Sequence, residues 1–281
     1  MRLLHGRPLA ERVHDESRRR IDALRARGVT PTLAVISVGI DPAANTYLGR
    51  LVRSGKHIGV QVRDDALPRD ATERAVGEAL ERANRDRSVH GIVLLTPLPG
   101  KLDEGHLVDR IATEKDVEGV GPYNVGLLLD GRPRYVPSTA EAVVELLRFH
   151  EIPIRGADVV VVGRSTIVGR PAAALLLNED ATVTIAHSGT NDVAALTKRS
   201  DIVVIAVGRA GYLRGDMIAK GATVIDAGIN VTPAGIAGDA DADSVAQVAG
   251  ALSPVPGGLG AVTTALLLRN VVSAAERQTA D

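Results

Sequence analysis

Residues 158 to 171 combine residue types that could hold a phosphate group. Four consecutive valines in this stretch indicate a strand buried on both faces, as in the middle of a parallel sheet. Gly163 ends the strand, and Gly169 and Pro171 open a helical run, since proline is tolerated in the first turn of a helix. The unpaired N–H groups and the positive dipole end of such a helix favour a phosphate. Because Ser165 replaces the second glycine of the common G-x-G-x-x-G pattern, a dinucleotide-binding loop and an ordinary strand-to-helix turn are both open interpretations.

The composition and charge of the chain limit the classes of function. The 281 residues are 45% apolar and 24% charged, which is ordinary for a globular protein of one large or two modest domains. A net charge of −1 gives no reason to expect nucleic acid or an anionic membrane as a partner. No apolar run reaches the roughly 18 residues that span a membrane and the start is unlike a signal peptide, so a cytoplasmic location is expected. The chain has no cysteine, so disulfides and cysteine-ligated metals are excluded, and no metal site is predicted.

Helices and strands alternate in the first half of the chain, which predicts βαβ units and a parallel sheet. Helices are expected over residues 8–27, 42–58 and 72–84, and strands over 32–38, 60–62 and 91–95. Asp41 is expected to cap the second of these helices. Functional groups gather at the carboxyl ends of such strands, which points to residues 39–47, 95–99 and 115–121.

The second half repeats this alternation as a compact Rossmann-like unit. After a helix at 139–150, strands are expected at 159–162, 182–186, 202–206 and 223–226, with helices starting near residues 171, 191 and 216. A loop over 253–260 offers mainly backbone to line a site. A last helix over 262–275 is expected to return to the first half.

Short motifs occur in order along the whole chain: Val38-Gly39-x-Asp41-Pro42-Ala43 with Tyr47; Pro97-Leu98-Pro99; Lys115-Asp116-Val117-Glu118-Gly119; Gly163-Arg164-Ser165-x-x-Val168-Gly169-x-Pro171; Val224-Ile225-Asp226-x-Gly228-Ile229-Asn230; Gly238-Asp239; and Pro254-Val255-Pro256-Gly257-Gly258. This set resembles the bifunctional methylenetetrahydrofolate dehydrogenase/methenyltetrahydrofolate cyclohydrolase family. The resemblance implies two α/β domains facing each other across a cleft, with NADP and tetrahydrofolate as ligands, and a homodimer paired through the nucleotide domains. We therefore expect a substrate domain at residues 1–138 and 259–281, completed by the C-terminal helix. An NADP-binding Rossmann domain with a mostly parallel sheet is expected at 139–258.

On the substrate side, the resemblance implies a Tyr-x-x-x-Lys pair on one helix, a Gln that orients the Lys and an Asp that binds the pterin. Tyr47 is present and is the predicted catalytic residue, whereas Leu51 and Leu95 stand at the Lys and Gln positions and Glu118 at the Asp position. Because Lys and Gln are replaced together, neither is left as a buried polar group without its partner. The predicted substrate-binding residues are Tyr47, Leu51, Leu95, Pro97, Glu118, Pro256, Gly257 and Gly258.

On the nucleotide side, Arg164 and Ser165 follow the first predicted strand and Ser188 follows the second, with no acidic residue beside it. A cation and hydroxyls without a carboxylate favour the 2′-phosphate of NADP over the ribose hydroxyl of NAD. Alternatively, Arg164 is a solvated loop residue, and the residues predicted to line the nicotinamide serve only the geometry of turns. The predicted cofactor-binding residues are Gly163, Arg164, Ser165, Val168, Gly169 and Ser188, with Gly208, Gly228 and Ile229 on the nicotinamide side.

These features predict an NADP-dependent oxidoreductase of one-carbon metabolism that converts 5,10-methylenetetrahydrofolate to 5,10-methenyltetrahydrofolate. Cyclohydrolase activity is expected to be weak or lost, because Leu51 and Leu95 replace the Lys and Gln that the resemblance implies. Arg50, three residues after Tyr47, is a poor substitute because a guanidinium stays protonated. Two alternatives are open: a diverged enzyme that uses the same cleft for another small molecule, and a non-catalytic nucleotide-binding dimer.

Overall fold

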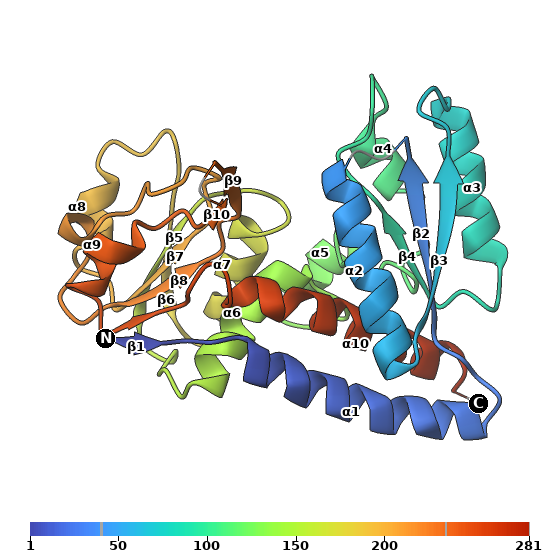
Figure 1. Cartoon of the computed structure of the whole chain (residues 1–281), viewed down its shortest axis with the longest axis horizontal. Helices are drawn as coiled ribbons and strands as arrows, with labels where there is room; N and C mark the ends of the chain where they lie inside the picture. Colours follow the sequence, from blue (N-terminus) through green and yellow to red (C-terminus); the bar gives the residue numbers. More distant parts are fainter. Residues whose placement is uncertain (40–41, 234, 281) are drawn as a thin grey trace. The chain divides into compact units, whose positions relative to one another are not determined.

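The computed structural model describes residues 1–39, 42–233 and 235–280, which form two compact units (Figure 1). The six-stranded unit contains Met1–Glu11 and Pro137–Thr263, and the three-stranded unit contains Arg12–Val136 and Thr264–Asp281. Both units are built on parallel sheets flanked by helices, which confirms the predicted α/β class. Within the described residues, no helix combines the length and apolar character needed to cross a bilayer.

The three-stranded unit has its strands in the order β3-β2-β4, and all pairs are parallel. The strands are β2 (Thr32–Val38), β3 (Gln61–Leu67) and β4 (Gly91–Leu94). The helices are α2 (Pro42–Ile58), α3 (Glu73–Arg85), α4 (Glu104–Val108), α5 (Pro122–Leu129) and most of α1 (Arg7–Ala26) and α10 (Thr263–Gln278). The predicted helices and the strands β2 and β4 of the first half are thus confirmed. Asp41, the expected cap of α2, lies outside the described residues.

The side chains of β2 are buried on both faces of this sheet. Leu33 and Val35 pack in a core with α1, α2, β4 and α10, whereas Ala34 and Ile36 pack in a second core with α3 and α4. Successive side chains of a strand point to opposite faces, so an all-apolar central strand carries a layer of helices on each side. The first of these cores fixes α2 against the end of β4.

Strand β3 extends well beyond the predicted end at Val62. The prediction stopped there because charged residues interrupt the apolar pattern. In the structure β3 is an edge strand, where charged side chains can remain solvated. Arg63 forms ion pairs with Asp65 and Asp86 at 2.8 and 2.9 Å, so the charges of this strand are satisfied locally.

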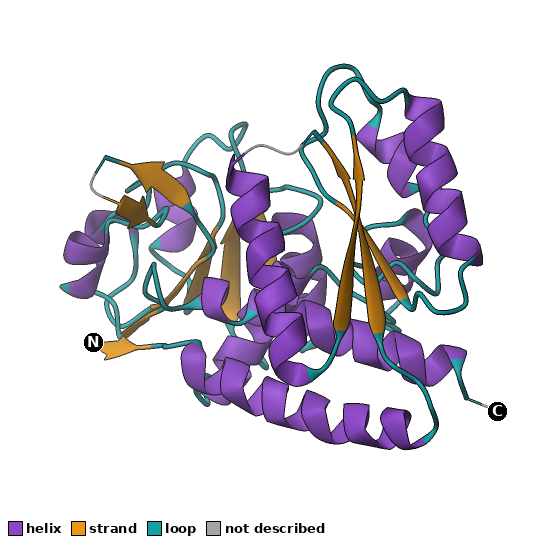
Figure 2. Cartoon of the chain, turned by 45° about the vertical axis from the view of Figure 1, so that its right-hand side comes forward, coloured by secondary structure: helices purple, strands orange, loops and turns teal. Residues whose placement is uncertain are grey.

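The main sheet of the six-stranded unit has the order β1-β11-β8-β7-β5-β6, and all its pairs are parallel. Its strands are β1 (Arg2–Leu3), β5 (Asp158–Val162), β6 (Thr182–Ala186), β7 (Ile202–Ile205), β8 (Thr223–Asp226) and β11 (Ala251–Leu252). The helices are α6 (Ser138–Phe149), α7 (Gly169–Asn178), α8 (Val193–Thr197) and α9 (Ala242–Ala246), with 3₁₀ turns η1 (Gly215–Met217) and η2 (Leu259–Ala261). The antiparallel hairpin of β9 (Asn230–Thr232) and β10 (Gly235–Ala237) is separate from this sheet (Figure 2, upper left).

Two details of the six-stranded unit differ from the sequence-based expectations. The first residues were expected with the substrate domain, but β1 pairs with β11, so Met1–Glu11 belongs to the six-stranded unit. The helix expected near Asp216 is only the turn η1, where the chain passes close to α9: a Cβ on Gly215 would lie 2.3 Å from the carbonyl oxygen of Ser244. The assignment of substrate and nucleotide to the two units stays a prediction.

Candidate active site

The loop between β5 and α7 has the close backbone approach of a phosphate cradle. Gly163 has φ +134°, and a Cβ on it would lie 2.1 Å from the carbonyl oxygen of Ala206. A Cβ on Gly169 would lie 2.3 Å from the carbonyl oxygen of Gly163. Both positions therefore require glycine, and the glycines bring the N-terminus of α7 against the end of the central strand.

Ser165 and Arg164 provide the polar groups of this loop. The Ser165 Oγ accepts hydrogen bonds from the N–H groups of Val168 and Gly169 at 3.2 and 3.3 Å, at the start of α7. The Arg164 side chain is exposed and forms no hydrogen bond or ion pair with any described residue. A cation of this kind beside a helix N-terminus can bind an anion without first breaking an ion pair.

Strand β6 brings Ser188 to the same edge of the sheet. β5 and β6 pair in parallel with Val162 opposite Ala186, so the residues that follow the two strands are neighbours. The first acidic residue after β6 is Asp192, whose carboxylate accepts the Ala195 N–H and caps α8. Hydroxyls and a cation, without an available carboxylate among these described residues, fit a phosphate better than a ribose hydroxyl.

Gly208, Gly228 and Ile229 lie beyond β7 and β8 at this same carboxyl edge. Gly208 has φ +66°, and a Cβ on Gly228 would lie 2.3 Å from the Cγ of Asp239. Turn geometry therefore explains both glycines by itself. Ile229 is 64% exposed and offers an apolar surface to a ligand ring.

Pro256, Gly257 and Gly258 follow β11, also at the carboxyl edge of the six-stranded sheet. The Gly6 N–H donates to the carbonyl oxygen of Gly257 at 2.9 Å, and a Cβ on Gly6 would lie 2.2 Å from the carbonyl oxygen of Gly258. The loop is thus built on the N-terminal segment. These three predicted substrate residues lie in the unit of the nucleotide loop, not in the unit of Tyr47.

In the three-stranded unit, Tyr47 packs on a core that contains both Leu51 and Leu95. Leu51 lies one turn after Tyr47 on α2 and is fully buried, and Leu95 is 6% exposed. Hydrocarbon therefore occupies the positions at which a Lys and a Gln were expected. Burial and, secondarily, the charge of Glu118 raise the pKa of the Tyr47 phenol above its ordinary value, so it stays protonated at neutral pH.

Glu118 is the carboxylate of its segment that is left for a ligand. Lys115 donates to three backbone carbonyls, and Asp116 accepts from two backbone N–H groups and from the side chain of Asn124, so both are structural. Glu118 forms no hydrogen bond or ion pair with any described residue. Burial and the nearby Asp116 charge raise the pKa of Glu118 to about 7. A desolvated carboxylate without a protein partner gains strongly from a ligand that donates two hydrogen bonds.

Pro97 lies in the exposed loop after β4, at the carboxyl edge of the three-stranded sheet. The neighbouring Leu98 N–H donates to Glu104 Oε1 at 2.7 Å, which ties this loop to α4. The structure thus collects Tyr47, Pro97 and the residues around them in one unit, and the predicted cofactor-binding residues in the other.

Asp239 was not selected from the sequence, although the structure gives it a central place among the nucleotide-side loops. Its carboxylate is fully buried and accepts hydrogen bonds from the turn after β7. The available signal was the pair Gly238-Asp239, because a Cβ on Gly238 would lie 2.0 Å from Asp226 Oδ2. Only glycine permits so close an approach of the backbone to the Asp226 carboxylate, and Asp239 is the next residue along the chain.

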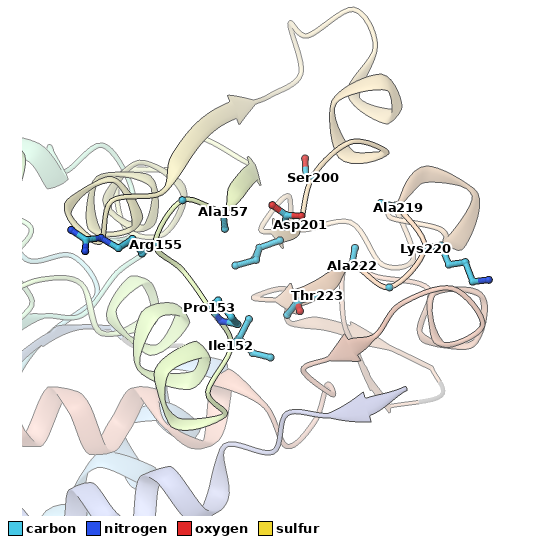
Figure 3. Close-up of a pocket in the computed structure, with 13 residues that line it drawn as sticks. Ile152, Pro153, Arg155, Ala157, Ser200, Asp201, Ala219, Lys220, Ala222 and Thr223 are labelled. Carbon is cyan, nitrogen blue, oxygen red and sulfur yellow. The ribbon is translucent and has the colours of Figure 1, made fainter.

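A pocket of about 480 Å³ lies at the amino ends of β5, β7 and β8 (Figure 3). Its lining includes Arg155, Asp201 and Thr223, and none of the predicted site residues. Since the predicted loops follow the carboxyl ends of these strands, this pocket is at the opposite edge of the sheet. The described residues contain no group of three or more His, Cys, Asp or Glu side chains that could hold a metal ion.

Comparison with known proteins assigns both parts of the chain to one family. Residues 4–118 match the catalytic domain of tetrahydrofolate dehydrogenase/cyclohydrolase, and residues 137–279 match the NAD(P)-binding domain of the same family. The chain is 46% identical over 280 residues to the bifunctional protein FolD of Roseiflexus sp. (strain RS-1), covering 99% of this chain and 97% of the relative.

Solved structures give the same result. The bifunctional FolD methylenetetrahydrofolate dehydrogenase/cyclohydrolase from Campylobacter jejuni superposes with a TM-score of 0.96 at 36% identity, covering 99% of each chain. The FolD enzyme of Trypanosoma brucei, solved with NADP cofactor and an inhibitor, superposes with a TM-score of 0.94 at 36% identity, covering 99% of this chain and 98% of that one.

Proposed function

Because this chain belongs to the tetrahydrofolate dehydrogenase/cyclohydrolase family, we propose that it oxidises 5,10-methylenetetrahydrofolate with NADP⁺ and has weak or no cyclohydrolase activity. The proposed dehydrogenase activity is supported by the family and by the glycine-containing loop between β5 and α7. The proposed loss of cyclohydrolase activity is supported by the apolar core against which Tyr47 packs.

The two reactions of the family make different demands on the protein. Oxidation needs mainly positioning, because the folate nitrogen lone pair expels the hydride and bound NADP⁺ accepts it. Hydrolysis of the methenyl cation also needs a group that takes a proton from water. A partly buried Tyr47 with a raised pKa is a poor base at neutral pH, and Leu51 and Leu95 add no proton acceptor.

The nucleotide-side residues fit NADP without a change of fold. The backbone around Gly163 and Gly169 would hold the pyrophosphate at the N-terminus of α7. Arg164 and Ser188 would hold the 2′-phosphate, which supports a preference for NADP over NAD. Ile229 would support the nicotinamide ring with apolar surface.

On the folate side, Glu118 would accept two hydrogen bonds from the aminopyrimidine edge of the pterin. Glu118 has one methylene more than the expected Asp, which displaces its carboxylate by about 1.5 Å. A displacement of that order in a positioning group can cost about a hundredfold in rate. We therefore propose slower dehydrogenation than in a relative that carries Asp.

Two separate assays test the proposal on purified protein. With 5,10-methylenetetrahydrofolate and NADP⁺, we expect methenyl absorbance to appear and to persist, because its hydrolysis is not catalysed. With methenyltetrahydrofolate alone, we expect decay at the rate of the uncatalysed reaction. Absence of NADP⁺ reduction at high enzyme concentration rejects the dehydrogenase and favours another substrate or a non-catalytic nucleotide binder. Rapid enzyme-dependent decay of the methenyl compound rejects the loss of cyclohydrolase.

We further propose a cytoplasmic homodimer paired through the six-stranded units. The β9–β10 hairpin exposes Val231 at 90% and Ile236 at 50%, and exposed apolar side chains that lie together favour burial in an interface. Sedimentation of the purified chain over a concentration series tests this. A monomer at all concentrations would reject it.

A further inference from the structure

Two buried carboxylates link the loops at the carboxyl edge of the six-stranded sheet. Asp226 is the last residue of β8 and is 3% exposed, and Asp239 follows the β9–β10 hairpin and is fully buried. Neither belongs to the loop between β5 and α7 that would hold the pyrophosphate.

Asp239 fixes the turn after β7. Its Oδ2 accepts the N–H groups of Val207 and Gly208 at 2.6 and 2.8 Å, and its Oδ1 accepts the N–H of Arg209 at 2.9 Å. The same Oδ1 accepts the Asn230 side-chain amide at 2.8 Å. Three successive backbone N–H groups thus point at one carboxylate, which leaves them unable to donate to a ligand.

Asp226 holds Asp239 and the segment after β8 together. Its Oδ1 accepts the N–H groups of Gly228 and Asp239 at 2.8 and 3.0 Å, and its Oδ2 accepts the Ala240 N–H at 2.8 Å. Its own N–H donates to the Ser253 hydroxyl, at the start of the loop after β11. The two carboxylates therefore join the loops that follow β7 and β8, and the Ser253 hydroxyl joins the loop after β11 to the backbone of Asp226.

Burying two carboxylates in this network costs folding free energy, which favours a role for the loop geometry that they hold. Burial raises the pKa of the Asp226 carboxyl, which shows that the site disfavours its charge even with the surrounding N–H donors. The turn after β7 also touches the nucleotide loop, since the carbonyl oxygen of Ala206 faces the Cα of Gly163. Because β5 lies between β6 and β7, residues 207–209 border that loop on the side away from β6.

We propose that Asp239 is a positioning residue for the nicotinamide half of the dinucleotide, and that Asp226 holds Asp239 in place. This inference rests on the proposed function, because it assumes that NADP binds at the carboxyl edge. It assigns the adenosine half to the residues that follow β5 and β6, which neither carboxylate contacts.

The test compares NADP⁺ with adenosine 2′,5′-bisphosphate, which carries only the adenosine half, by calorimetry on the full chain. The variants are Asp239→Asn and Asp226→Asn. Each replaces one carboxylate oxygen, which accepts from backbone N–H groups, with an amide nitrogen that can only donate. The control is Asp241→Asn, because the Asp241 side chain caps α9 by accepting the Ser244 N–H and forms no hydrogen bond with residues 207–209, Gly228 or Ser253. Loss of hydrogen bonds to a charged acceptor predicts NADP⁺ binding weaker by about tenfold or more, with less than about a twofold change for the bisphosphate and for the control.

Equal weakening of both ligands would show a general structural role, and no weakening of either would show no role; both overturn the inference. If Asp239→Asn does not fold, the pattern for Asp226→Asn decides. Failure of the unaltered chain to bind NADP⁺ contradicts the proposed function itself, which separates the two failures.

Discussion

Tyr47, Leu51 and Leu95 carry the proposal that this chain has lost cyclohydrolase activity while the protein core stays intact. A lysine in place of Leu51 would be fully buried and would need a hydrogen-bonding partner, and an amide in place of Leu95 is close enough to share the same core. Removing both together leaves no unpaired polar group, so the substitution carries little stability cost.

Restoring both polar groups is therefore expected to restore hydrolysis. The double variant Leu51→Lys with Leu95→Gln should hydrolyse methenyltetrahydrofolate faster than the parent by roughly 10²-fold or more, the usual contribution of a positioned acid–base group. Leu51→Lys alone should lower the free energy of unfolding by about 3 kcal/mol, because it buries a charge without its partner. Measurements are the decay of methenyl absorbance and chemical denaturation.

The matched control is Val52→Lys, which adds the same charge at a 42% exposed position of the same helix. It should change neither hydrolysis nor stability appreciably. If the double variant folds, binds folate and still fails to hydrolyse, the assignment of Leu51 and Leu95 to the lost function is incorrect.

The carboxyl of Glu118 makes stability depend on pH. Its folded-state pKa of about 7 lies above the value near 4.3 of an unfolded chain, so the folded protein binds the extra proton between these values. Stability therefore falls as pH rises through that window, and above it the folded state carries a desolvated carboxylate. Glu118→Gln should raise Tm at pH 8, on the order of 2–4 °C for each kcal/mol recovered, and change it little at pH 5.

The exposed Glu114→Gln serves as the control for this experiment, since it lies in the same segment. Thermal unfolding of both variants at the two pH values is the measurement. A Tm gain for Glu118→Gln that is equal at pH 5 and pH 8 would contradict the role of this titration. Glu118→Gln should also weaken folate binding above pH 7, because an amide offers only one acceptor to the pterin edge.

At the scale of elements, the strand β5, its glycine loop and helix α7 form the proposed anion-binding part of the molecule. The strand is buried, the glycines permit close approach of the backbone, and the helix N-terminus supplies positive potential. These parts depend on close backbone packing, because Gly163 is required by the carbonyl group of Ala206 after β7 and Gly169 by the carbonyl group of Gly163.

Arg164→Gln should separate phosphate recognition from dinucleotide binding. Loss of a charge-assisted contact predicts a KM for NADP⁺ higher by about tenfold or more, with little change for NAD⁺. Arg155→Gln is the control, because Arg155 precedes the amino end of the same strand, is exposed and pairs with Asp180. Steady-state kinetics with both nucleotides is the measurement, and an equal loss for NAD⁺ would argue against a 2′-phosphate contact.

At the scale of the whole molecule, two α/β units with different topologies are made from one chain. α1 and α10 each begin in the six-stranded unit and continue in the three-stranded unit. Each unit has its own apolar core, so the chain can carry two sites whose local geometry is set independently.

The proposed homodimer gives a test at this scale. Val231→Lys on the β9–β10 hairpin should weaken dimerisation by about tenfold or more, because it places a charge in an apolar interface. Leu129→Lys is the control, since Leu129 is apolar, 71% exposed and lies in the other unit. Sedimentation equilibrium measures both, and equal dimerisation of the two variants would place the interface elsewhere.

Local patterns were sufficient for most of the helices and strands and for the geometry of the loop between β5 and α7. The valines of β5 and the glycines at 163 and 169 specify a buried strand and a tight turn by their own steric properties, whatever lies around them. The sequence also determined the family, and the proposal on residues 51, 95 and 118 came from it as well, because ordered motifs and residue identity need no coordinates.

Tertiary structure alone decided the features that depend on long-range partners. The pairing of β1 with β11 and the length of β3 follow from neighbouring strands, which no local pattern contains. The Asp116 carboxylate accepts internal hydrogen bonds, whereas Glu118 is left for a ligand. This difference follows from the packing around two similar side chains. Asp239 gained its place in the same way, since a carboxylate acquires its role from the N–H groups that folding brings to it.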